Sequence, residues 1–106
     1  ERCIVVSDAA SLAGMVPGEY ETLGNQVVLE KNGKLHNPNT GYLMGSSATI
    51  LDCANWLASL RLVSFDDLMK MLYYNPLQLI GIEPESVAEN KNLFFDEQRS
   101  VFSFRK

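Results

Sequence analysis

The short apolar run at the start of the chain constrains the fold most. Residues Cys3–Val6 are apolar without alternation, and Asp8 follows two residues later. Such a run predicts a strand that is buried on both faces and has other strands beside it. Asp8 therefore lies at the carboxyl end of a buried strand, where barrel enzymes place catalytic groups. The alternative is that Asp8 is a cap or turn residue that opens a loop.

Length and charge limit the number of domains and the kinds of partner that we expect. Its 106 residues fit one domain, and 46% hydrophobic with 21% charged residues is a globular composition. The net charge of −4 argues against nucleic acid or an anionic membrane surface as partner. No apolar run approaches the roughly 20 residues that span a bilayer. The start at Glu1, without a signal peptide, indicates a processed product or a piece of a longer protein.

Cysteine and histidine, the usual ligands of zinc, are sparse. Cys3 and Cys53 fit neither a zinc spacing nor a redox pair, so we expect reduced, buried thiols in a cytoplasmic protein. A disulfide between them stays open as an alternative. His36 is the one histidine of the sequence and stands in a polar loop, so we expect a solvated side chain rather than a metal ligand.

Residues 20–35 predict a small antiparallel meander. Gly24-Asn25 separates two strand-like runs and suggests a tight hairpin. Asn32-Gly33 is a second hairpin signal, because both central positions of a type I′ turn need positive φ. Lys34-Leu35 would begin the third strand, and residues 36–41 form a polar surface loop.

Residues 46–82 predict helices. The first is capped by Ser46 or Ser47 and ends near residues 60–62. The second is capped by Ser64, and it ends at Asn75-Pro76, where a short third helix starts. Gly81 is the expected stop of that third helix.

The end of the chain completes an α+β pattern. Residues 93–95 and 100–104 are strand-like, and the second run alternates apolar with polar residues. The fold class expected for the isolated chain is therefore α+β. The first strand finds no partner of its own kind in this layout, which suggests that the chain was cut from a larger protein.

Four motifs in order carry a family resemblance. Residues 5–14 read Val-Val-Ser-Asp-Ala-Ala-Ser-Leu-Ala-Gly, and residues 17–33 carry Pro-Gly-Glu-Tyr and a Val-Val hairpin closed by Asn-Gly. Residues 41–49 read Gly-Tyr-Leu-Met-Gly-Ser-Ser-Ala-Thr, and residues 75–81 read Asn-Pro-Leu-Gln-Leu-Ile-Gly. In this order the chain resembles the C-terminal third of N-acetylglucosamine-6-phosphate deacetylases of the amidohydrolase superfamily.

The resemblance implies an α/β parent, a TIM barrel with a small β-sandwich. Residues 1–19 would be the last barrel strand and catalytic loop, and residues 20–35 the β-meander. Residues 46–82 would be helices that close the barrel, and residues 83–106 the return strands of the sandwich. The parent is expected to be a cytoplasmic homo-oligomer that binds a small amino sugar phosphate.

The resemblance also implies site residues. Asp8 would act as general base and then general acid in hydrolysis of the N-acetyl group of N-acetylglucosamine 6-phosphate. Leu43, Met44 and Gly45 match a substrate-binding loop, in which Met44 is larger than usual for the family. The family binds a divalent metal, zinc or iron, through a glutamate and two histidines that have no counterpart here and would lie upstream of Glu1.

Two other functions stay open. Many amidohydrolases carry an Asp after the last barrel strand, so a deaminase or another deacylase fits the Asp8 motif as well. A second class of function is a non-catalytic α+β interaction module or a degenerate paralogue. Such a module would unfold cooperatively as a defined species, whereas a severed barrel piece would expose strand edges and associate.

These implications predict that the isolated chain is inactive. Without the upstream ligands, the 106 residues should neither bind the catalytic metal nor release acetate from N-acetylglucosamine 6-phosphate. An acetate assay of the purified chain with added zinc or iron(II) checks this. Metal-dependent turnover above the protein-free blank would contradict it.

Overall fold

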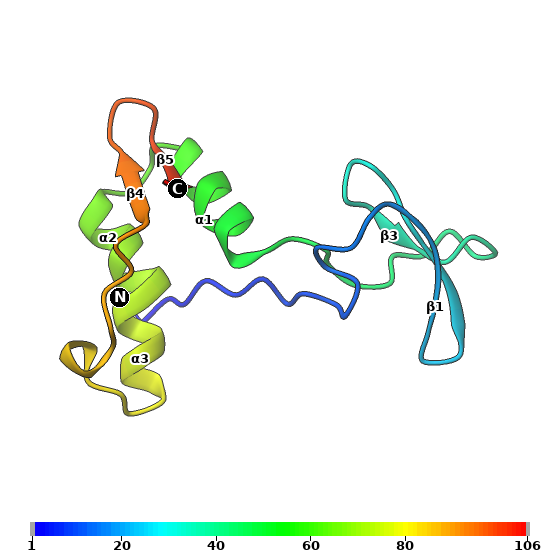
Figure 1. Cartoon of the computed structure of the whole chain (residues 1–106), viewed down its shortest axis with the longest axis horizontal. Helices are drawn as coiled ribbons and strands as arrows, with labels where there is room; N and C mark the ends of the chain where they lie inside the picture. The colour runs from blue at the N-terminus through cyan, green and yellow to red at the C-terminus, as the bar shows by residue number, and fades with distance from the viewer. Residues whose placement is uncertain (1, 106) are drawn as a thin grey trace. The chain divides into compact units, whose positions relative to one another are not determined.

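The computed structural model describes residues 2–105, which divide into two compact units. The sheet unit is Ser7–Ile50. The helical unit joins the residues up to Val6 to those from Leu51 onward. Figure 1 shows the helices and strands of both. The expected α+β class is confirmed, with antiparallel sheets of three and two strands.

The sheet unit contains the predicted meander. Strands β1 (Gly18–Thr22), β2 (Asn25–Leu29) and β3 (Leu35–His36) pair antiparallel in the order β1-β2-β3. Alternation along the strands turns one face inward, which gives the unit its apolar core. The buried members of this core are Leu12, Val27, Leu29 and Leu35.

Both turns of the meander differ from the sequence prediction. Thr22 pairs with Asn25, so the first loop is Leu23-Gly24, one residue earlier than predicted, and both residues have positive φ. Three residues rather than two separate Glu30 from Lys34 in the second loop. The amide of Gly33 donates to the Glu30 carbonyl (3.0 Å), and Gly33 alone in this loop has positive φ. This is the geometry of a type I turn closed by a left-handed glycine, so the predicted type I′ turn is wrong.

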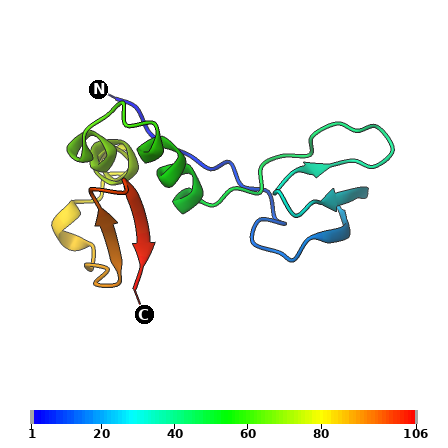
Figure 2. The same ribbon diagram turned by 90° about the horizontal axis from the view of Figure 1, so that it is seen from above.

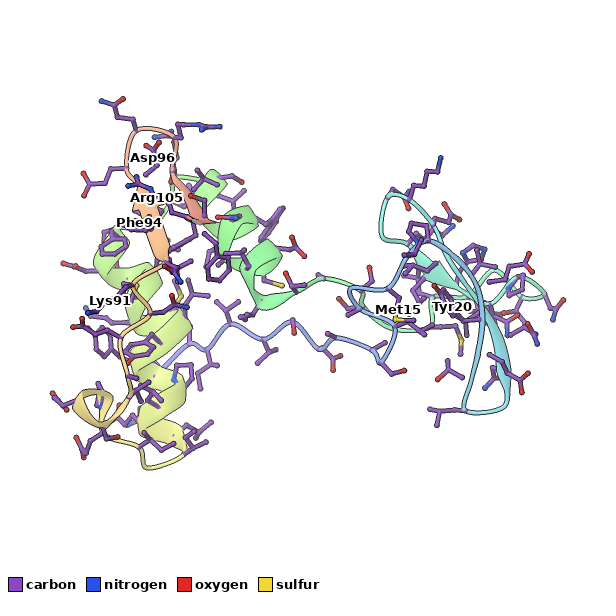
Figure 3. All side chains as sticks on the ribbon, in the orientation of Figure 1. Met15, Tyr20, Lys91, Phe94, Asp96 and Arg105 are labelled. Atoms are coloured by element: carbon purple, nitrogen blue, oxygen red, sulfur yellow. The ribbon has the colours of Figure 1, made fainter. Side chains whose placement is uncertain are left out.

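The helical unit contains α1 (Ile50–Ser59) from Leu51 onward and, near the C-terminus, the hairpin of β4 (Leu93–Asp96) and β5 (Val101–Phe104). Figure 2 shows this hairpin beside the helices. The buried core joins helices to hairpin through Ala54, Ala58, Leu68 and Phe102. On the hairpin, the guanidinium carbon of Arg105 lies 4.0 Å from the centre of the Phe94 ring (Figure 3), a cation–π distance.

The middle of the helical unit is one continuous helical segment. It runs through α2 (Phe65–Met69), the π-helical turn η1 (Lys70–Tyr74) and α3 (Asn75–Leu79), and the 3₁₀ turn η2 (Pro84–Ser86) follows. The predicted break at Asn75-Pro76 is therefore wrong. Pro76 has no N–H to donate, and the wider π turn directly before it accommodates the missing bond.

Three helix ends were predicted from capping residues, and two of these predictions are confirmed. The Ser64 side chain accepts from the Asp67 amide (3.1 Å), so this N-cap is confirmed. Gly81 is confirmed as a helix stop: its φ is +74°, and the amides of Gly81 and Ile82 donate back into the last helical turn. Ser46 and Ser47 do not cap α1, because the helix begins at Ile50 and their hydroxyls bind elsewhere.

The structure has no strand at Cys3–Val6, and the strand predicted there is wrong for this chain. A strand needs another strand at hydrogen-bonding distance. Here the amide of Val5 donates to the Met71 carbonyl (3.1 Å), and the Cys3 carbonyl accepts from the Asn75 side chain (2.8 Å), so this segment binds a helix. Both cysteines are free, but Cys3 is exposed and Cys53 is only partly buried, so the predicted burial of both thiols is wrong. None of the helices within residues 2–105 is long and apolar enough to cross a membrane.

Asn55 should contribute strongly to stability of the helical unit. Its side chain donates to the Phe102 carbonyl (3.0 Å) and accepts from the Phe102 amide (2.7 Å). Asn55→Ala leaves both backbone groups of a buried residue without this partner, so the free energy of unfolding should fall by about 2 kcal/mol in urea titrations. Ser59→Ala, on the exposed end of the same helix, is the control. Equal losses in the two variants would contradict the assignment.

Candidate functional site

Asp8 lies in the sheet unit on an exposed loop with left-handed backbone. Its φ is +49°, one of four positive values among the described residues other than glycine. Aspartate tolerates this region better than most residues, because its short side chain can bond locally. Backbone held in sparsely populated regions clusters at functional sites, so the geometry motivates a functional hypothesis for Asp8. Its carboxylate is exposed.

The loop that follows Asp8 lies against the predicted substrate-binding segment. The amide of Ala10 donates to the Ser46 carbonyl (2.7 Å), and Ala9 and Ser46 form a parallel bridge. A Cβ atom added to Gly45 would lie 3.3 Å from the Cβ of Ala10, so a side chain there would crowd the loop. The structure thus brings together two segments that are far apart in the sequence.

The three residues of the predicted binding segment face different surroundings. Leu43 is 69% exposed, and its backbone bridges to His36. Met44 donates its amide to the Leu35 carbonyl (2.9 Å), and its side chain packs against the core of the sheet unit. Gly45 has a φ of +110°, which side chains rarely adopt. Leu43 and the backbone of Gly45 are therefore open to a ligand, whereas the Met44 side chain supports the segment from below.

His36 was expected to be solvated in a loop, and this expectation is wrong. It ends strand β3, and its side chain is only 17% exposed. Its Nδ1 atom lies 3.3 Å from Glu30 Oε1, within ion-pair distance but without hydrogen-bond geometry. A small rotation of either side chain would align the pair for a hydrogen bond. No local signal revealed the burial of His36, because its place on β3 depends on pairing with Val28.

A metal does not fit the described residues by themselves. Residues 2–105 contain no group of three His, Cys, Asp or Glu side chains that could hold a metal ion. Among the ion pairs of the described residues, His36 has a single carboxylate partner, Glu30. The site built by this chain is therefore one carboxylate, Asp8, next to a segment with an open backbone.

Comparison with known proteins finds a likeness among solved structures. No protein-family model and no curated protein matches the sequence. Among solved structures, the chain is similar to N-acetylglucosamine-6-phosphate deacetylase from Pasteurella multocida, with a TM-score of 0.63 and 25% identity. The match covers 74% of this chain and 20% of the deacetylase chain.

This chain resembles part of an N-acetylglucosamine-6-phosphate deacetylase. The resemblance first drawn from four sequence motifs is thus confirmed by structure. The chain spans about a fifth of the length of the deacetylase that it matches.

Gly45→Ala should disturb the Asp8 loop. The added Cβ would press on Ala10, and alanine at a φ of +110° is strained by about 1–3 kcal/mol. We expect the amide resonances of Ala9 and Ala10 to shift in ¹⁵N NMR spectra. Gly41→Ala is the matched control, because Gly41 also has positive φ but has nothing within 4 Å of an added Cβ. Unchanged Ala9 and Ala10 resonances in Gly45→Ala would show that the two segments do not touch.

Proposed function

We propose that this chain is the C-terminal part of a metal-dependent amidohydrolase. The proposed reaction is hydrolysis of the N-acetyl group of N-acetylglucosamine 6-phosphate to glucosamine 6-phosphate and acetate. The observation that carries the proposal is the Ala10–Ser46 hydrogen bond, which joins the Asp8 loop to the segment from Leu43 to Gly45. The structural likeness to a deacetylase of this substrate supports it.

Asp8 would move the proton in this reaction. As general base it takes a proton from the water that attacks the acetamide carbon, and the new C–O bond forms. As general acid it then gives that proton to the amine nitrogen as the C–N bond breaks. A carboxylate suits this work when it lies within hydrogen-bond reach of both atoms. Its exposure in the sheet unit leaves it accessible to substrate.

The segment from Leu43 to Gly45 would hold the substrate. The missing side chain of Gly45 leaves room for Ala10, and because Gly45 is exposed, a sugar phosphate can approach its backbone. The exposed Leu43 side chain offers an apolar surface for the sugar. The Met44 side chain packs against the core of the sheet unit and so holds the segment in place on the meander. Substrate binding would therefore use a preformed surface.

The metal would be held by residues outside this chain. Zinc or iron would polarise the amide carbonyl and lower the pKa of a bound water. The described residues contribute no ligand set of their own. We also propose that the whole protein is a cytoplasmic homo-oligomer with no nucleic-acid or membrane partner.

Asp8→Asn in the longer protein that contains this chain tests the proposal. The asparagine cannot carry the proton, so kcat for acetate release should fall at least ~100-fold, as is usual when a general acid–base is removed. Asp66→Asn, which removes one exposed carboxylate from α2, is the control and should keep kcat within about twofold.

Each other outcome has a defined meaning. Turnover that survives Asp8→Asn would make Asp8 a turn residue. If the unaltered protein releases no acetate but releases ammonia from an amino-substituted base, the protein is a deaminase instead. If the longer protein binds metal but hydrolyses neither substrate class, the hypothesis of a non-catalytic paralogue is favoured.

A further inference from the structure

We propose that Ser47 is a positioning residue for the Asp8 loop, a role whose catalytic meaning rests on the function proposed above. The Ser47 hydroxyl donates to the carbonyl of Gly33, 2.5 Å away, in a partly buried contact. This bond joins the segment after the binding residues to the turn between β2 and β3. It does not belong to any helix or strand ladder.

The Gly33 carbonyl is a fixed acceptor. Gly33 closes a tight turn with a φ of +87°, and its amide is bonded to the Glu30 carbonyl. The turn is held again where the Glu30 amide donates to the Lys34 carbonyl (2.9 Å). A Cβ added to Gly33 would lie only 3.1 Å from the Ser47 hydroxyl oxygen, so the two segments are in close contact.

The Ser47 bond completes a clamp on residues 44–47. At the other end of this segment, the Met44 amide is bonded to strand β3 at Leu35. Between these two anchors, the Ser46 carbonyl accepts the Ala10 amide, two residues after Asp8. The meander therefore holds the segment at both ends, and the middle of the segment holds the Asp8 loop.

The neighbouring serine shows that this role is specific to Ser47. The Ser46 hydroxyl accepts from the Ala48 amide (3.1 Å), a local contact that reaches no other segment. Only the hydroxyl of Ser47 spans to the meander. The adjacent pair thus offers a variant that breaks the clamp and a control that changes the same number of atoms.

Loss of the Ser47 hydroxyl should loosen the loop without unfolding the unit. The core and the β1–β2 ladder do not depend on this bond. The Ser46–Ala10 hydrogen bond, however, would lose the anchor on one side and open more often. Proton transfer depends steeply on geometry, so a displaced Asp8 would slow the reaction with little change in substrate binding.

Amide hydrogen exchange of the full 106-residue chain tests the clamp without substrate. In Ser47→Ala, we expect exchange at the Ala10 amide to be roughly tenfold faster, the effect of one lost hydrogen bond. The amides of Val27 and Leu29 in β2 should keep their rates. Ser46→Ala should leave the Ala10 rate unchanged, and Ser47→Thr, which keeps a hydroxyl, should restore protection.

Three results would overturn the proposal. The first is an unchanged Ala10 rate in Ser47→Ala. The second is equal acceleration at Ala10, Val27 and Leu29, which would show general destabilisation rather than positioning. The third is a Ser46→Ala effect as large as that of Ser47→Ala. If the alanine variant does not fold, Ser47→Cys, whose thiol is a much weaker hydrogen-bond donor, takes its place in the same comparison.

The kinetic readout separates this proposal from the deacetylase function. In an active longer protein, Ser47→Ala should lower kcat by about tenfold while KM stays within about twofold. A large rise in KM with constant kcat would contradict positioning of Asp8. If no deacetylation is found at all, the exchange result still decides whether the clamp exists.

Discussion

The hydrogen bond from the Ala10 amide to the Ser46 carbonyl is the contact on which the candidate site depends. It is short, at 2.7 Å, and it is one of few backbone links between the first loop of the sheet unit and the rest of that unit. Leu12 of the same loop is buried in the core, and this bond aligns the loop with the segment from Leu43 to Gly45. With it, a carboxylate and an open glycine backbone become neighbours. The remainder of the sheet unit supports this contact: the small core beneath Met44 and the turn at Gly33 fix the Ser46 side of the bond.

Sequence reasoning succeeded where the controlling interaction is local. The Ser64 cap depends on an amide three residues away, and the Gly81 stop depends on its own φ. The meander followed from turn residues and alternation, although each turn was assigned the wrong register or type. A two-residue and a three-residue loop with the same glycine differ only in how the strands pair, and pairing is set by the core across the sheet.

It failed where the partner is distant. The apolar run Cys3–Val6 satisfies the pattern of a buried strand, but a strand also needs a neighbour, and in this chain the segment bonds to a helix instead. His36 looked like a loop residue because its polar neighbours follow it, while its position on β3 depends on pairing with Val28. No local sequence pattern predicts the contact between residues 44–47 and Ala10 either. The one indication of this contact in the sequence was that both segments resemble motifs of the same family.

The way the first residues are held also bears on the order of folding. The hydrogen bonds from the Val5 amide to Met71 and from the Asn75 side chain to Cys3 close a long loop that contains the entire sheet unit. The entropy cost of closing a flexible loop grows with its length, and structure formed inside the loop shortens the flexible part. The contacts within the sheet unit are closer in sequence, and local contacts form faster. The sheet unit would therefore assemble before the N-terminal segment docks, and docking would be the late, easily reversed step.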